Sequence, residues 1–151
     1  MRATDLLKRQ HDEVKGIFEA LRDAEVNERA ELRQRLATAL RAHNQMEEEL
    51  LYPRFEEKEG FEELIANAWE QHEEATAALA ELERLAVDEA GFDDQLGLVQ
   101  DLVLEHVALE ENEVIPRIEQ VWTNDMLEEL GADMRERFDQ LLEAGGEEAR
   151  V

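Results

Sequence analysis

The chain has 151 residues and a formal net charge of −24, because 40 aspartates and glutamates face only 16 lysines and arginines. This length suits one domain with a sizeable core, and the acidity argues against nucleic acid or an anionic membrane as a partner. The absence of cysteine excludes disulfides, zinc–thiolate sites, iron–sulfur clusters and thiol catalysis. No apolar run approaches the ~20 residues that cross a bilayer, and the first residues lack the apolar segment of a signal peptide. We therefore expect a cytoplasmic protein.

Apolar residues recur every three to four positions, which predicts helices. No segment of useful length alternates between apolar and polar residues with the period of two that is typical of a strand. Capping residues and glycines divide the chain into five helical stretches. They run from Thr4 or Asp5 to Ala24, from Asn27 to the Lys58–Gly60 region, from Phe61 to Asp88, from Asp93 or Asp94 to Gln120, and from Thr123 or Asn124 to Gly145–Gly146. The first four predict an all-α, antiparallel, up-down four-helix bundle over residues 1–121. Residues 122–151 form a C-terminal helix and tail of the same domain.

Each of the first four helices has an inward-facing apolar stripe, and each stripe contains one of the four histidines. Chance rarely places every histidine of a chain on such stripes, so a shared reason is favoured. The surrounding sequence repeats. Gln10–Val14 resembles Gln71–Ala75, which lies 61 residues later, and the segment after His43 resembles the one after His106, 63 residues later. The bundle is therefore predicted to be a duplicated helical hairpin.

Each predicted hairpin carries a histidine and a glutamate four residues apart, His43 with Glu47 and His106 with Glu110. Residues at this spacing lie one turn apart on the same helix face. A carboxylate in an apolar core is costly unless it is paired, hydrogen-bonded or bound to metal. Two divalent metal ions explain the set, each with two imidazoles and with both glutamates as bridges. Imidazole together with carboxylate suits iron, manganese or zinc.

A single histidine followed by His-x-x-x-Glu, present twice, resembles the pattern of the hemerythrin-like (HHE cation-binding) family. The resemblance covers about residues 4–120 and includes Leu51-Tyr52-Pro53 after the first pair. It implies a four-helix bundle around a non-haem di-iron centre, oxo- or hydroxo-bridged, that binds O2 or a related small oxidant. Carried over to this chain, the resemblance implies terminal ligands at His11, His43, His72 and His106 and bridging ligands at Glu47 and Glu110.

Two features depart from the oxygen carriers of that family. Their third helix carries His-x-x-x-His, whereas Thr76 lies four residues after His72. Their fourth helix carries His-x-x-x-x-Asp, whereas the repeat favours Glu110 as the bridge and leaves Glu111 as the alternative. The missing fifth histidine leaves a nearly symmetric site and weakens the case for reversible oxygen carriage. A ferritin-like centre is disfavoured because no carboxylate lies three residues before any histidine.

Three functions follow from these residues together with what the resemblance implies. The first, which we favour, is binding of O2, peroxide or nitric oxide as a small ligand for sensing, scavenging or protection. The second is a di-iron enzyme with peroxidase-like, catalase-like or nitric-oxide-processing activity. The third is a non-redox metal-binding module, in which manganese or zinc replaces iron.

Several residues near the predicted ligands have a structural and a functional interpretation. Tyr52 either packs beside Pro53 or tunes a bound oxygen species, and each proline, Pro53 and Pro116, is expected to kink or end its helix. The neighbouring acids Glu48, Glu49, Glu111 and Glu113 are expected on solvated or boundary faces. The last helix has an apolar face that either covers the domain's own core or binds a second copy or another protein: Leu127, Leu130, Met134, Phe138 and Leu141.

Overall fold

The computed structural model describes residues 1–150, with side chains as far as residue 146, and this part of the chain is helical with short connections and no strand. The elements in chain order are α1 (Ala3–Asp23), α2 (Val26–Met46), the π-helix η1 (Glu47–Leu51), α3 (Tyr52–Phe55), α4 (Glu62–Arg84), α5 (Phe92–Leu109), the π-helix η2 (Glu110–Val114), α6 (Ile115–Val121) and α7 (Asn124–Arg150). None of the described helices is both long enough and apolar enough to cross a membrane.

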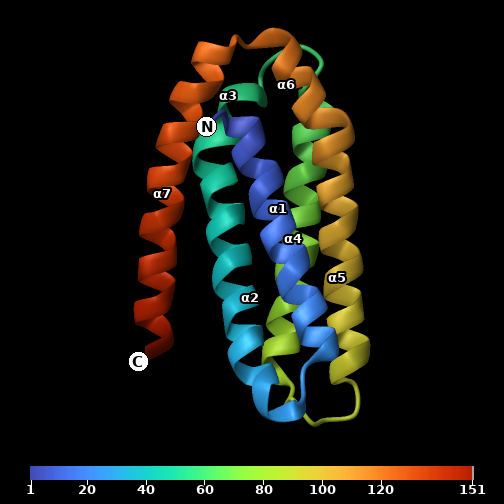
Figure 1. Cartoon of the computed structure of the whole chain (residues 1–151). Coiled ribbons are helices and arrows are strands. Elements are labelled where there is room, and N and C mark those ends of the chain that lie inside the picture. The colour runs from blue at the N-terminus through green and yellow to red at the C-terminus, as the bar shows by residue number, and fades with distance from the viewer. Residues whose placement is uncertain (151) are drawn as a thin grey trace.

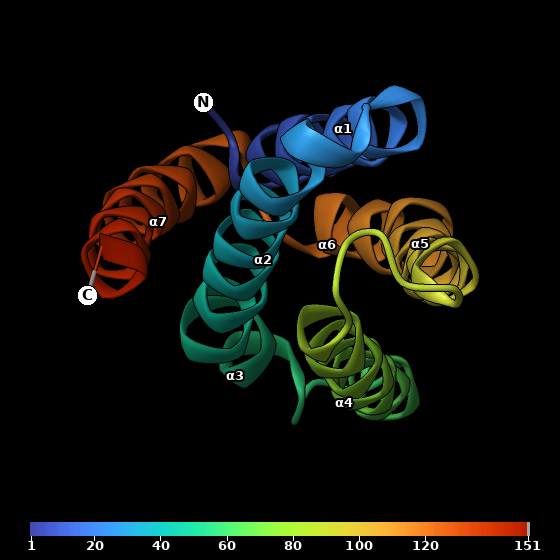
Figure 2. The same cartoon turned by 90° about the horizontal axis from the view of Figure 1, so that it is seen from below.

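Figure 1 shows that α1, α2, α4 and α5 run alternately down and up, with the α1–α2 and α4–α5 connections at one end. Viewed from below, these four helices stand at the corners of a bundle, and α7 lies outside it against α1 and α2 (Figure 2). The predicted antiparallel four-helix bundle with an additional C-terminal helix is thus confirmed. Each hairpin, α1 with α2 and α4 with α5, brings two histidine-bearing stripes face to face.

The two helices that carry the His-Glu pairs each contain a π turn just before a proline. In η1 the backbone N–H of Tyr52 donates to the carbonyl of Glu47, five residues back, and in η2 Ile115 donates to Glu110 in the same way. Pro53 and Pro116 follow directly, in the first turn of α3 and α6. Because proline has no N–H and its ring clashes with the carbonyl four residues back, the wider turn accommodates it. The prolines therefore interrupt the α-helical hydrogen bonding without ending the rod.

The predicted ends of the helices were less accurate. The second rod ends at Phe55 instead of the Lys58–Gly60 region, and α4 ends at Arg84, short of Asp88. α7 continues to Arg150, so the expectation that Gly145–Gly146 ends the last helix was wrong. A Cβ on Gly145 would lie 2.9 Å from Thr38 Cγ2. Glycine there lets α7 pack closely on α2 without displacing the Thr38 side chain.

Two apolar clusters fill the bundle, one on each side of the four histidines. The first includes Leu7, Met46, Tyr52, Phe55, Ile65, Ile118 and the inner face of α7. The second lies toward the α1–α2 and α4–α5 connections and includes Phe18, Leu36, Leu79, Phe92 and Val99. In α7, Leu127, Leu130, Met134 and Phe138 are buried and Leu141 is half-buried. Of the two interpretations of this stripe, the structure supports covering of the domain's own core.

Candidate metal centre

All six predicted ligands meet at one depth of the bundle, between the two apolar clusters. They form two groups that share both glutamates: His11, His43, Glu47 and Glu110 in the first, and Glu47, His72, His106 and Glu110 in the second. Within each group one ligand atom per residue lies within 4.8 Å of the others. Glu47 and Glu110 are fully buried, with 0% of their surface exposed, and the four histidines are buried as well. Each group could hold a metal ion, and the two groups have both carboxylates in common.

The ligand helices place both glutamates where a regular helix changes to a π turn. Glu47 is the first residue of η1, and Glu110 is the first residue of η2. The i to i+4 spacing brings His43 Nε2 within 3.2 Å of Glu47 Oε1, and His106 Nε2 within 3.3 Å of Glu110 Oε2. π turns occur often at functional sites. Here each π turn accommodates the proline that follows the His-Glu pair, so that the helix continues beyond it.

The outer ring nitrogens of two histidines are held by glutamine side chains. His43 Nδ1 donates to Gln10 Oε1 at 2.6 Å, and His106 Nδ1 donates to Gln71 Oε1 at 2.9 Å. A hydrogen bond at Nδ1 fixes the ring orientation and leaves Nε2 to face the centre of the site. Each glutamine immediately precedes a ligand histidine on the partner helix of its hairpin. This role was not predicted, although the Gln-His pair recurs in the repeat.

The other two histidines are held by carboxylates. His11 Nδ1 donates to Glu111 Oε2 at 2.7 Å, and His72 Nδ1 donates to Glu48 Oε2 at 2.9 Å. Glu48 and Glu111 lie at the boundary, as expected, with side chains 31% and 28% exposed. Their contacts with the histidines were not expected. Glu111 supports a ligand histidine from outside, while Glu110 occupies the shared central position that the repeat favours.

Tyr52 contributes a seventh polar group to the centre. Its hydroxyl donates to Glu110 Oε2 at 2.7 Å and also lies 3.3 Å from Glu47 Oε1. The same oxygen lies 3.1 Å from His72 Nε2 and 3.4 Å from His106 Nε2. The purely structural interpretation of Tyr52 is therefore insufficient, because its hydroxyl reaches four ligand atoms. Thr76, at the position of the missing fifth histidine, is exposed.

The two buried carboxylates set the electrostatics of the site. Burial by itself lowers the pKa of His106, but the charge of Glu110 and hydrogen bonds to Glu110 and Glu47 outweigh it and raise that pKa to about 10. The pKa values of His11 and His72 are also raised against the effect of burial, by Glu110, Glu47 and Glu111 for His11 and by Glu47 and Glu48 for His72. Burial raises the pKa of Glu47, but the charge of His43 and hydrogen bonds to its neighbours bring it well below its ordinary value. The centre thus favours positive charge, from protons or from metal ions.

Two buried ligand atoms have no hydrogen-bond partner among the described residues, His43 Nε2 and Glu47 Oε2. Buried polar atoms are almost always satisfied, so each exception needs an explanation. His43 belongs to the first group, and Glu47 belongs to both. A bound cation would satisfy an imidazole nitrogen and a carboxylate oxygen at once, and this donor set suits iron, manganese or zinc. The residues present therefore fit a metal.

A small cavity touches all four histidines. Its volume is about 10 Å³, measured as the space open to the centre of a water molecule, which is room for about one water. Apolar side chains make most of the remaining wall: Val14, Leu40, Ala75, Val103 and Val107. A molecule of two or three atoms fits such a space, whereas a metabolite of ordinary size does not.

Comparisons with known proteins agree with this geometry. The family model for the hemerythrin HHE cation binding domain matches residues 2–118. The uncharacterized proteins Rv2633c of Mycobacterium tuberculosis and Mb2666c of Mycobacterium bovis are each 31% identical to this chain in an alignment 144 residues long. The alignment covers 93% of this chain and 88% of each relative. A crystal structure of a hemerythrin HHE cation binding domain-containing protein from Mycobacterium kansasii, described as a homolog of Rv2633c, is also similar. It has a TM-score of 0.90 and 30% identity, over 100% of this chain and 93% of that one.

The chain belongs to the hemerythrin HHE cation-binding family. The matched residues 2–118 contain all six predicted ligands, both supporting glutamines and Tyr52. α7 begins after the matched region. The bundle is thus a cation-binding domain, with its His-Glu clusters suited to metal.

Proposed function

We propose that the protein is a non-haem di-iron protein that binds O2 or a related small oxidant for sensing, scavenging or protection. One observation carries the proposal: two buried ligand groups share Glu47 and Glu110, and they border a cavity that admits only a very small molecule. His11 and His43 would hold one ion, and His72 and His106 the other. The metal pair supplies the redox chemistry when bound.

The protein's own residues have three tasks in this proposal. The four Nδ1 hydrogen bonds orient the imidazoles and keep Nε2 toward the ions. The two apolar clusters and the apolar cavity wall exclude bulk water from the site, which strengthens each electrostatic contact there. The raised histidine pKa values mean that metal must displace protons as it binds. The first two features favour metal binding and entry of small, weakly polar ligands, whereas the competition with protons makes the metal affinity rise with pH.

Metal stoichiometry with optical spectroscopy tests the proposal. We expect two irons per chain by elemental analysis of iron-loaded protein, and new absorption bands on addition of O2, peroxide or azide. One iron or none per chain would contradict the di-iron assignment. A purified protein that holds zinc or manganese and stays spectrally silent would favour the non-redox metal-binding module.

A second candidate, a peroxidase-like, catalase-like or nitric-oxide-processing enzyme, is favoured by Tyr52. Its hydroxyl is buried among the ligands, 2.7 Å from Glu110 Oε2, so it can donate a hydrogen bond or a proton inside the site. The decisive measurement is turnover of peroxide or nitric oxide by the iron-loaded protein. Steady turnover that falls in a Tyr52→Phe variant would favour the enzyme over the binding protein.

A further inference from the structure

The wall of the small cavity consists of five pairs of residues that the internal repeat makes equivalent. The pairs are His11 with His72, His43 with His106, Val14 with Ala75, Leu40 with Val103, and Asn44 with Val107. Four pairs match in chemistry, because they join histidine to histidine or one aliphatic side chain to another. The fifth places an amide opposite an apolar side chain. The residues that line the cavity therefore include one additional polar residue, on the first hairpin.

Asn44 is 7% exposed, and it is the only polar side chain besides the histidines in the wall of this cavity. Its side-chain amide makes no hydrogen bond to any group in the part of the chain that the structure describes. The amide is not among the buried polar atoms that lack a partner, so it still touches solvent, and it is free to bond a molecule that enters the cavity. Valine at the equivalent position 107 shows that the fold itself accepts an apolar residue there.

We infer that Asn44 is a specificity-determining residue, whose amide N–H donates a hydrogen bond to a small ligand held in the cavity. The inference rests on the proposed function. A hydrogen bond in apolar surroundings is stronger than one in water, and more so when the acceptor carries charge. Asn44 therefore favours ligands whose far atom accepts a hydrogen bond, such as azide or hydroperoxide, over ligands that accept poorly.

The first test measures azide binding to the iron-loaded protein by absorption titration. Asn44→Leu keeps the approximate shape of the side chain and removes its donor. We expect azide affinity to fall about tenfold or more, as loss of a hydrogen bond to a charged group requires, with iron content unchanged. Val107→Ala is the matched control, because it alters the opposite wall without removing a polar group. Its azide affinity should stay within about threefold of the wild type.

The second test uses metal-free protein and separates a ligand-binding role from a structural one. If the Asn44 amide has no partner, Asn44→Leu leaves the melting temperature unchanged or raises it. A clear fall would show that the amide is needed by the fold and would overturn the inference. Unchanged azide affinity in iron-loaded Asn44→Leu would also overturn it, while leaving the di-iron proposal intact. Failure of the wild type to hold two irons or to bind azide would contradict both.

Discussion

In the first hairpin, Tyr52 extends its hydroxyl into the ligand cluster, and Asn44 brings an amide to the cavity wall. In the second hairpin the equivalent positions, 63 residues later, hold Ile115 and Val107. Ile115 is buried at 1% exposure, so the same place in the fold is filled by a hydrocarbon. The candidate ligands and the residues that hydrogen-bond them are matched between the hairpins, whereas Tyr52 and Asn44 are not.

Under the proposed function, the matched residues would hold the metal and the unmatched ones would contact its ligand. Each hairpin contributes two histidines, one shared glutamate, one supporting glutamine and one supporting glutamate, in equivalent places. A third difference between the hairpins, after Tyr52 and Asn44, lies on the outside of the bundle, because α7 packs on α1 and α2 of the first hairpin. The duplicated elements thus place equivalent candidate ligands in both hairpins. Only the first hairpin adds the polar groups of Tyr52 and Asn44, and α7 packs on its outer face.

The largest expected effect comes from removing a residue that both ligand groups share. Glu47→Ala and Glu110→Ala each delete a ligand from both groups, so we expect metal content to fall from two ions per chain to nearly none. His43→Ala deletes a ligand from one group only and should leave about one ion. Elemental analysis of the loaded variants distinguishes these outcomes. Equal losses in all three variants would contradict the two-group arrangement.

The pH dependence of the metal-free protein comes next. The pKa of His106 is raised from 6.5 to about 10, so the stability that its protonation contributes is complete below about pH 6.5 and is lost as pH rises through 10. The pKa of Glu47 is lowered, so its contribution is present above its ordinary pKa and is lost as pH falls through the lowered value. Thermal unfolding of metal-free protein should show a loss of a few kcal/mol between about pH 6.5 and 10.

Metal-loaded protein should behave in the opposite sense over the same range. Ligand histidines must be neutral to bind metal, so metal affinity rises with pH and the gap between loaded and metal-free melting temperatures widens. Glu110→Gln is the control in the metal-free protein, because it removes the main cause of the raised His106 pKa. A stability that stayed flat from pH 6.5 to 10 in the wild type would contradict the charge balance described above.

The equivalence of the two hairpins can be tested at the supporting glutamines. Gln10→Leu removes the acceptor of His43 Nδ1, and Gln71→Leu removes that of His106 Nδ1. Loss of such a group typically lowers metal affinity by about 10- to 100-fold. We expect each variant to lower the affinity for one of the two ions by a similar factor. Competition with a chelator measures this affinity. A loss of metal affinity in only one of the two variants would show that the two hairpins do not contribute equally to metal binding, although their hydrogen bonds are equivalent.

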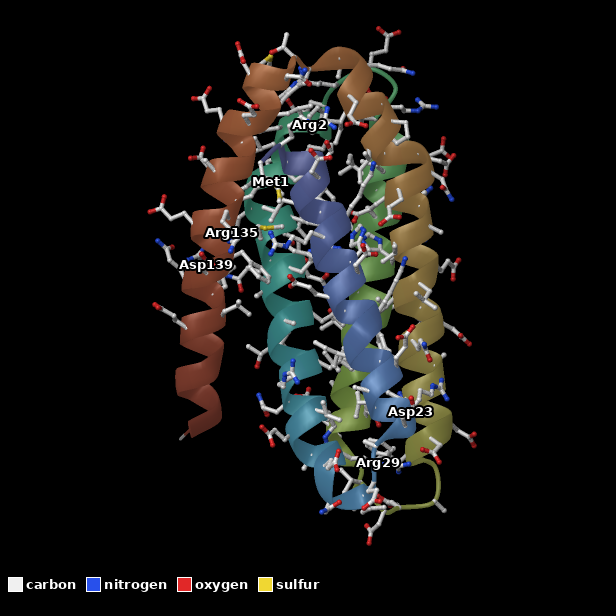
Figure 3. The ribbon with its side chains drawn as sticks, in the orientation of Figure 1. Met1, Arg2, Asp23, Arg29, Arg135 and Asp139 are labelled. Carbon is white, nitrogen blue, oxygen red and sulfur yellow. The ribbon has the colours of Figure 1, made fainter. Side chains whose placement is uncertain are left out.

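The packing of α7 on the first hairpin can be tested where α7 meets the N-terminus. Met1 and Arg2 lie beside α7 (Figure 3), and a Cβ on Gly131 would lie 2.1 Å from the Met1 carbonyl oxygen. Gly131→Ala therefore forces two backbones apart, and we expect it to destabilise the protein by about 1–3 kcal/mol. The control is Gly16→Ala in α1, where a Cβ meets nothing within 4 Å. That variant should be neutral or stabilising, by up to about 1 kcal/mol, in denaturant unfolding.

The smallest expected change in stability concerns Tyr52, whose equivalent in the second hairpin is Ile115. Tyr52→Phe removes the hydroxyl that donates to Glu110 Oε2 and leaves the buried ring in place. We expect metal-free protein to lose about 1–2 kcal/mol, while the loaded protein shows altered absorption bands. Ile115→Val in the second hairpin should cost about 0.5–1.5 kcal/mol without a spectral change. A spectrum of loaded Tyr52→Phe identical to that of the wild type would mean that the hydroxyl does not sense the metal.

The sequence predicted the bundle and the six candidate ligands because both depend on local spacing. His43 and Glu47 share a helix face whatever surrounds them, and the repeat transfers the same argument to His106 and Glu110. Single residues without a partner in their own helix were harder to interpret. Tyr52 had a packing interpretation and a functional one, and the choice depended on where α4 and α5 place His72 and His106. Helix ends were also poorly predicted, because Gly145 serves packing against Thr38 instead of ending α7.

Periodicity and spacing by themselves determined that this chain forms a helical bundle with histidines and glutamates on its inner faces, since these are properties of one helix at a time. Only the tertiary structure decided which atoms converge. The supporting contacts of Gln10, Gln71, Glu48 and Glu111 cross between helices, and the cavity at Asn44 exists because four helices meet around it. The physical reason is that hydrogen bonds and cavities depend on positions within a few tenths of an ångström, which packing of the whole bundle sets.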